Sequence, residues 1–267
     1  MDVKLIKQRL ASLQTRGNSD KNKRAETVWK APIGKHQIRI IPAKWDKDNP
    51  FREVFVHYGI GNRTMIALSN FGEKDPIVEF AKQLRQTSDK ENWSLAKKLE
   101  PKMRVFSPVI VRGEEDKGVR LWEFGKQVYQ ELLSIADDPD VGDYTDPIQG
   151  RDITIETTGP ETNGTSFNQS KVRVRTKQTA LSESAQEVEK WLSNQPDVFS
   201  IFKKYGYDEM KEALVGFLNP EDQADEPAPV APTPAAAPAS DPLTQSTFEL
   251  HAKKSIDDEF DELFNLK

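Results

Sequence analysis

The chain has 267 residues, of which 36% are hydrophobic and 30% are charged, and it contains no cysteine. This length suits one sizeable domain or two small ones, and the low apolar content predicts that part of the chain stays unfolded. The lack of cysteine excludes disulfides, thiol nucleophiles and cysteine-bound zinc, and favours a reducing cytoplasm. No apolar run of about 18 residues predicts a membrane span, and the charged N-terminus predicts no signal peptide.

Charge is distributed unevenly along the chain. Residues 219–267 carry eleven acidic and three basic side chains, a net charge of −8, whereas the whole chain carries −5. The preceding 218 residues therefore carry +3. A mildly basic body joined to a strongly acidic tail suggests a polyanionic partner for the body.

Residues 1–26 are predicted to form a basic N-terminal arm. Leu5, Ile6, Leu10 and Leu13 have the spacing of a short amphipathic helix, which the run Gly17–Asp20 would end. A solvated helix end and a binding arm fit this pattern equally well.

Short strands separated by turn residues are predicted from Thr27 to about Leu181. The expected strands are Ile38–Ile40, Val54–Tyr58, Met103–Arg112, Gly118–Phe124, Ile153–Ile155 and Lys171–Lys177. Helices are expected over Pro76–Gln86, Gly125–Ala136, Ser182–Leu192 and Tyr207–Leu218. The pattern predicts a mainly β fold with peripheral helices, folded over residues 27–218, and it fits a small antiparallel barrel better than a parallel sheet.

The C-terminal part of the chain divides into a linker and an acidic end. Residues 219–248 are rich in proline and alanine and are predicted to be a disordered spacer. Residues 249–267 are acidic with interspersed apolar side chains, which favours docking into a partner over a mere solubility tail. The residues predicted to bind partners are Asp257, Asp258, Phe260, Asp261, Leu263 and Phe264.

Catalytic motifs are not evident. His36, His57 and His251 lie in unrelated contexts, and neither a phosphate-binding glycine loop nor a nucleophile elbow is found. Nor do acids cluster with metal-ligand spacing. We therefore expect a protein that is not an enzyme and uses no cofactor or metal.

Basic and aromatic residues alternate along several predicted strands. Arg39 alternates with Ile38 and Ile40, and Arg173 and Arg175 alternate with valines, so the cations are expected on an open face. Binding of a single strand needs such cations for the phosphates and flat rings for unstacked bases. The wider set of predicted DNA-binding residues is Arg39, Lys44, Trp93, Lys97, Lys98, Lys102, Arg104, Phe106, Arg120, Trp122, Phe124, Lys126, Lys171, Arg173 and Arg175. Ordinary core rings beside solvated lysines are the competing interpretation for any single position.

Between Trp29 and about Gln178 the sequence resembles the T-even phage family of single-stranded DNA-binding, helix-destabilising proteins. The resemblance rests on Val28–Lys30, on Ile38–Pro42 with Lys44, on Pro50–Phe51 followed by Val54–Gly59, on Ser94–Leu95 with Lys97–Lys98, and on Phe124–Lys126. The order of basic arm, core and acidic tail is also similar.

The resemblance implies an OB-fold core, a five-stranded Greek-key barrel that binds single-stranded DNA in a basic cleft. It implies phosphate contacts for Arg39, Lys97, Lys98 and Lys126, and base stacking for Trp93, Phe106, Trp122 and Phe124. It further implies an arm, with Lys4, Lys7 and Arg9, that contacts the neighbouring monomer on DNA, and a tail that recruits replication and recombination proteins. The expected setting is the cytoplasm of an infected bacterial cell, where the protein would coat DNA during replication, recombination and repair.

One feature of that family is missing. Its classical members hold a structural zinc with three cysteines and a histidine, and His57 stands where that histidine would be, but no cysteine accompanies it. A site of that type is lost. We expect a small apolar cluster from Phe71 to Leu84 to replace it.

Two other functions remain open on the sequence. A regulator that binds single-stranded RNA would use the same stacking and phosphate contacts. A protein-binding OB-fold adaptor would use the tail as a tether, although it explains the cationic strands less readily.

Overall fold

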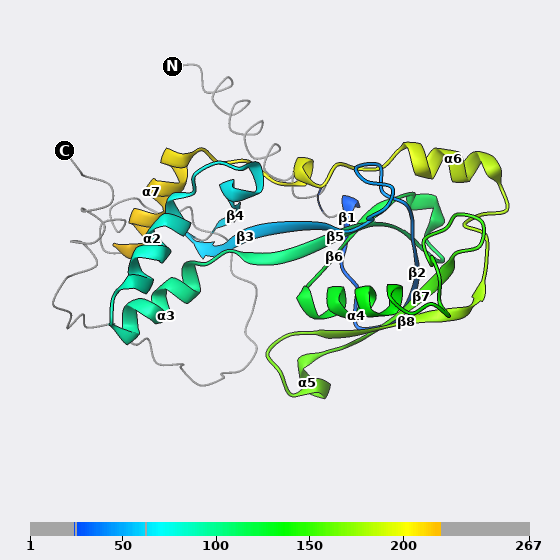
Figure 1. Cartoon of the computed structure of the whole chain (residues 1–267), viewed down its shortest axis with the longest axis horizontal. Coiled ribbons are helices and arrows are strands. Elements are labelled where there is room, and N and C mark those ends of the chain that lie inside the picture. Colours follow the sequence, from blue (N-terminus) through cyan, green and yellow to red (C-terminus); the bar gives the residue numbers. More distant parts are fainter. Residues whose placement is uncertain (1–23, 25, 62, 220–267) are drawn as a thin grey trace, which may run out of the picture. The chain divides into compact units, whose positions relative to one another are not determined.

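The computed structural model describes residue 24 and residues 26–61 and 63–219. Two compact units account for these residues. We call the first the sheet unit (described residues up to Phe55, and Met103–Lys203) and the second the helical unit (Val56–Lys102, and Lys204 to residue 219). The segment predicted as one folded core therefore contains two units. In the sequence, Val56–Lys102 of the helical unit lies between the two segments of the sheet unit, and the rest of the helical unit follows Lys203. Figure 1 shows the elements of both units.

Six strands form the framework of the sheet unit. They are β1 (Val28–Trp29), β2 (Gly34–Ile40), β5 (Lys102–Val111), β6 (Arg120–Phe124), β7 (Arg151–Thr158) and β8 (Gln169–Gln178). Their order is β1-β6-β5-β2-β7-β8. The β1–β6 pair is parallel and the other pairs are antiparallel. The order β7-β2-β5-β6 places the fourth of these chain segments beside the first, which is the Greek-key arrangement.

One face of this sheet carries the main core. Ile38 and Ile40 of β2 pack with Val109 of β5 and Ile153 of β7. Helix α4 (Lys126–Ala136) covers them with Val128 and Leu132, and Figure 1 shows it beside β8. On the opposite face, Trp191 of α6 (Ala185–Ser193) packs on Ile41, Ile110 and Leu181. The sheet is thus covered on both faces near α6, whereas β8 keeps one face open to solvent.

The helical unit has its own small core. Helices α2 (Pro76–Gln86), α3 (Lys90–Leu99) and α7 (Tyr207–Leu218) pack around the hairpin of β3 (Arg52–Ile60) and β4 (Arg63–Ile66). The expected apolar cluster is present, because Ile77, Phe80 and Leu84 are fully buried. Short helical turns complete the chain: η1 (Leu68–Phe71), η2 (Glu115–Lys117), α5 (Pro160–Asn163) and η3 (Phe199–Ile201).

The mainly β fold with peripheral helices is confirmed, and every strand and helix predicted between Thr27 and Leu218 is present within a few residues. Helix α3 was not predicted; the Asp89 carboxylate caps it by accepting a hydrogen bond from the Glu91 amide. None of the described helices combines the length and the apolar character needed to span a membrane. Residues 1–23 and 25 of the predicted arm, residues 220–248 of the linker and the acidic tail (249–267) lie outside the described residues.

Candidate nucleic-acid interface

Four cations line the open face of β8. Lys171, Arg173, Arg175 and Lys177 are all exposed, and we call them the β8 ladder. Val172, between the first two, is buried in the core. Side chains two residues apart on one face of a strand lie about 7 Å apart, so the ladder is a regular row of positive charge. The exposure predicted for these residues is confirmed, and their contact with DNA remains a prediction.

The neighbouring strands extend the polar surface beside the ladder. In the register of the sheet, Arg173 lies opposite Thr154, which in turn lies opposite Gln37. Directly paired residues point to the same face, so these side chains are neighbours. Arg175 donates a hydrogen bond from Nη1 to the Gln37 side-chain oxygen over 3.0 Å. The face therefore offers cations in front and hydrogen-bonding groups behind them.

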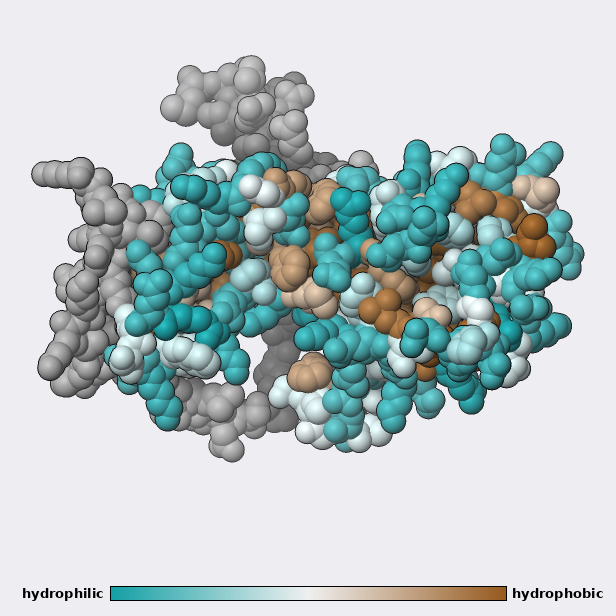
Figure 2. All heavy atoms as spheres, viewed as in Figure 1, coloured by the Kyte–Doolittle hydropathy of each residue, from teal (hydrophilic) through white to brown (hydrophobic). Residues whose placement is uncertain are grey.

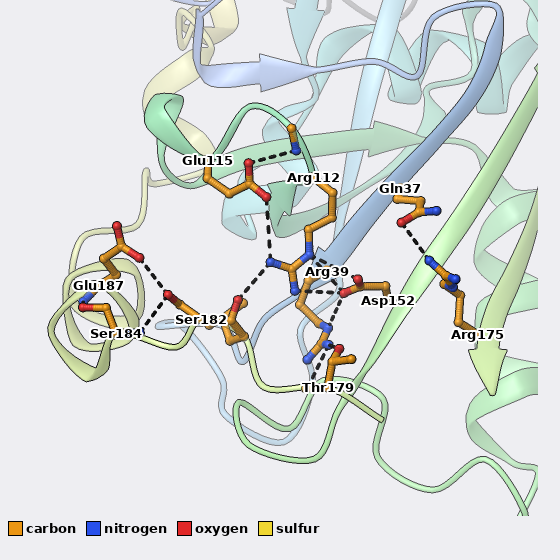
Figure 3. A network of polar contacts seen from close by, with 12 residues as sticks. Gln37, Arg39, Arg112, Glu115, Asp152, Arg175, Thr179, Ser182, Ser184 and Glu187 are labelled. Atoms are coloured by element: carbon orange, nitrogen blue, oxygen red, sulfur yellow. Dashed lines mark hydrogen bonds and ion pairs between the residues drawn. The ribbon is translucent and has the colours of Figure 1, made fainter. Parts of the chain in front are cut away.

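Arg39 lies on this face of β2 but is completely buried. Its Nε donates to Oδ1 of Asp152 over 2.9 Å, and its Nη2 donates to the Thr179 carbonyl over 2.9 Å (Figure 3). Burial lowers the pKa of Arg39, and the Asp152 carboxylate opposes that shift. The expectation that Arg39 contacts a phosphate from an open face is wrong. Helix α6, together with the segment that joins β8 to α6, covers this part of the sheet.

Asp152 also pairs with Arg112 of β5, whose Nη2 lies 3.0 Å from Oδ1. Arg112 donates from Nη1 to the Leu181 carbonyl over 2.9 Å. Figure 3 shows the two guanidinium groups gathered around one carboxylate, with Gln37 and Arg175 beyond it. The network joins β2, β5 and β7 to the segment that leads into α6, and it fixes the strands behind the ladder.

Three of the four predicted stacking rings are in the core. Phe106 and Trp122 are fully buried and Phe124 is nearly so. Trp122 packs edge-on against Trp29, and Phe106 packs edge-on against Phe202. The stacking role predicted for these rings is wrong for the structure described, since none presents a face to solvent. Strands β5 and β6 are covered on both faces, and alternation along such strands does not distinguish an open side.

The other predicted cations of the sheet unit are placed differently. Arg120 is buried and forms an ion pair with Glu114, so its prediction as a DNA contact is also wrong. Arg104 is half-buried, with Nε 3.8 Å from a carboxylate oxygen of Glu123. Lys44 and Lys126 are exposed, the first after β2 and the second at the start of α4.

The fourth predicted ring, Trp93 on α3, is in the helical unit and is 52% exposed. The guanidinium carbon of Arg85 lies 4.3 Å from its ring centroid, and this cation–π contact orients the ring. Lys97 lies one helical turn after Trp93. The Nζ of Lys102 donates a hydrogen bond to the backbone carbonyl of Lys97 over 2.9 Å. Lys97, Lys98 and Lys102 are all exposed. This ring and these cations keep the placement that stacking and phosphate contact require.

An exposed ring that was not predicted lies at the start of the ladder. Phe167, in the turn between β7 and β8, is 64% exposed. Its carbonyl accepts hydrogen bonds from Asn163 Nδ2 at 3.0 Å and from Thr165 Oγ1 at 2.8 Å, which fix the turn. Ile33, which is 63% exposed, packs over Gly159. A Cβ atom at position 159 would lie only 2.9 Å from the Cδ1 atom of Ile33. A large ring within the polar run Thr162–Asn168 was the available signal in the sequence.

His57, at the position of the family's zinc ligand, is buried and hydrogen-bonded in the helical unit. Its Nδ1 lies 2.9 Å from the Leu99 carbonyl and its Nε2 lies 3.2 Å from Oδ2 of Asp75. Asp75 also accepts from the amides of Leu68, Ile77 and Val78, and it caps α2. Burial raises the pKa of Asp75. The hydrogen bonds with His57 and with the backbone amides lower this pKa by more than burial raises it, so the net shift is downward. The described residues contain no group of three His, Asp or Glu side chains placed to hold a metal.

Comparison with known proteins identifies a family for this chain. A search of curated proteins finds no match. The family model described as gp32 DNA binding protein like matches residues 33–215, which is more than half of the chain and includes the β8 ladder, Phe167 and Trp93. The chain therefore belongs to the gp32-like family of DNA-binding proteins.

Proposed function

We propose that this protein binds single-stranded DNA without reading its sequence and coats it. The exposed β8 ladder is the observation that carries the proposal, because a row of cations on a flat strand suits successive phosphates. Phe167 in the sheet unit and Trp93 in the helical unit supply rings on which unpaired bases can stack. Family membership supports DNA as the ligand.

The sheet unit serves as an OB-fold in this proposal. Five of its strands follow the order β6-β5-β2-β7-β8, with the first strand in the chain pairing with the second and the fourth. A partly open Greek-key barrel of five strands is the architecture of OB-folds, which bind oligonucleotides on a strand face. The ladder lies on such a face.

The remaining parts of the proposal concern segments outside the described residues. The basic arm, with Lys4, Lys7 and Arg9, contacts the neighbouring monomer and makes coating cooperative. The acidic tail recruits replication and recombination proteins. The protein acts in the cytoplasm of a phage-infected bacterium, protects DNA during replication, recombination and repair, and catalyses no reaction.

Tryptophan fluorescence titrated with oligo(dT) tests the proposal. Trp29, Trp122 and Trp191 are buried and Trp93 is the most exposed of the five tryptophans, so quenching should arise mainly from Trp93. A Trp93→Phe variant should keep most of its binding in a mobility assay and lose most of the quenching. If neither the fluorescence titration nor the mobility assay detected binding of oligo(dT), the proposal would be contradicted and the protein-binding adaptor would be favoured. Stronger binding of a matched oligo(rU) would identify RNA as the ligand.

A further inference from the structure

A groove beside α6 is separate from the β8 ladder. It has a volume of about 790 Å³, and its apolar lining includes Pro42, Pro147, Ile148, Val188 and Leu192. Ile148 is 75% exposed. Figure 2 shows hydrophobic residues reaching the surface beside α6. An apolar groove left open to water is suited to bind an apolar segment.

Hydrogen bonds fix the backbone of two segments that line the groove. The Gln195 side chain accepts from the Lys44 amide at 2.8 Å and donates to the Pro42 carbonyl at 2.9 Å. The Asp146 side chain accepts from the Ile148 amide at 2.7 Å and holds that turn in place. The walls are therefore pre-formed, and a ligand would not need to order them.

We propose that the C-terminal tail of the same chain docks in this groove through Phe260, Leu263 and Phe264. Ile256 and these three residues have the spacing of one face of a helix, which is how an amphipathic segment enters an apolar groove. The docking requires no DNA.

The charges at the groove match the tail. Lys44 and Lys47 line the groove, and so do Glu183 and Glu189. The tail carries acids at 257–259, 261 and 262 for the lysines, and lysines at 253 and 254 for the glutamates. The basic arm offers the lysines only Asp2 within its first nineteen residues. Complementary charge therefore favours the tail over the arm of a neighbouring molecule.

The length of the intervening chain permits this docking. Thirty-six residues separate residue 219 from Ile256, and a proline-rich segment of that length spans up to about 110 Å. The sheet unit has about 130 described residues, and a folded unit of that size has a radius of gyration of only about 14 Å. The tail can therefore reach the groove from the end of α7. Docking would also keep the apolar tail residues from partner proteins.

The test uses the full chain, which has no cysteine to interfere with labelling. A nitroxide on Asn265→Cys should broaden the methyl signals of Ile148, Val188 and Leu192 in NMR spectra. It should leave the methyls of Leu133, which is exposed on α4 and does not line the groove, unchanged. Reduction of the nitroxide provides the reference intensities.

Two variants test the apolar anchors without disturbing the core. Replacing Phe260, Leu263 and Phe264 by serine keeps every charge of the tail and should abolish the broadening. Ile148→Glu, at a largely exposed position, should abolish it at Val188 and Leu192. Unchanged groove signals in the labelled chain, or broadening that survives the serine variant, would overturn the proposal. So would broadening seen only when spin-labelled chains are mixed with isotope-labelled ones, since the tail would then come from another molecule. DNA affinity is measured separately, so a failure here does not bear on DNA binding.

Discussion

Arg39 and Asp152 form an ion pair in the sheet unit, with Nε 2.9 Å from Oδ1 and the arginine side chain fully buried. The same carboxylate also holds Arg112. Breaking a buried pair by removing one partner leaves an uncompensated charge and costs about 3–5 kcal/mol. The pair is therefore a structural element behind the proposed DNA-binding face.

Asp152→Asn should accordingly lower the free energy of unfolding by about 3 kcal/mol, because two guanidinium groups lose their counterion. Urea denaturation followed by circular dichroism measures the change. Glu73→Gln is the matched control, since Glu73 pairs with Lys204 at a site where both side chains are about half exposed, and it should cost under about 1 kcal/mol. Equal losses in the two variants would show that the Asp152 network contributes no more than an exposed pair.

Asp75 should make the stability of the helical unit sensitive to acid. Its pKa in the folded protein is below the ordinary value of 3.8, so its carboxylate stabilises the fold above that pH. That contribution should disappear as the pH falls through the folded pKa. The difference in unfolding free energy between the wild type and Asp75→Asn should therefore shrink as the pH is lowered from 6 to 3. A difference that stays constant over this range would contradict the downward shift of this pKa.

Phe167 and Trp93 should contribute to DNA affinity but little to stability. Each stacked base is worth about 1–3 kcal/mol, so Phe167→Ala or Trp93→Ala should weaken oligo(dT) binding by about 5- to 150-fold. Leu133→Ala, at another exposed apolar position, is the control and should leave affinity unchanged. Trp122→Ala should instead cost about 3–5 kcal/mol of stability, because the ring is in the core. If Phe167→Ala binds as tightly as the control, that ring does not stack on DNA.

Much of the fold was predictable because its strands and helices have clear periodicity and turn residues. The β8 ladder was found in this way, since valines and cations alternate along an edge strand that is half covered. Arg39, Phe106 and Trp122 follow the same kind of pattern, yet they are buried. The reason is that β2, β5 and β6 are covered on both faces, by segments such as α6 that come much later in the chain. Local alternation gives the two faces of a strand, but tertiary packing decides which face meets water.

The helical unit shows a second limit of the sequence. Its apolar cluster was predicted, but the hydrogen bonds from His57 to Asp75 and Leu99 join residues up to 42 positions apart. No spacing rule indicates such contacts. Phe167 could have been noticed as a ring in a polar turn, whereas its hydrogen bonds to Asn163 and Thr165 required coordinates.

The salt dependence of oligo(dT) affinity for Arg173→Gln/Arg175→Gln tests the central claim most directly. Each phosphate neutralised by the protein contributes about 0.7 to the slope of log affinity against log salt for single strands. The double variant should lose affinity for every sequence tested, and its slope should become shallower by about 1.4. Lys82→Gln/Lys190→Gln removes two exposed charges from helices α2 and α6 and should leave the slope unchanged. A ladder variant whose slope and affinity match those of the control would contradict DNA binding on β8.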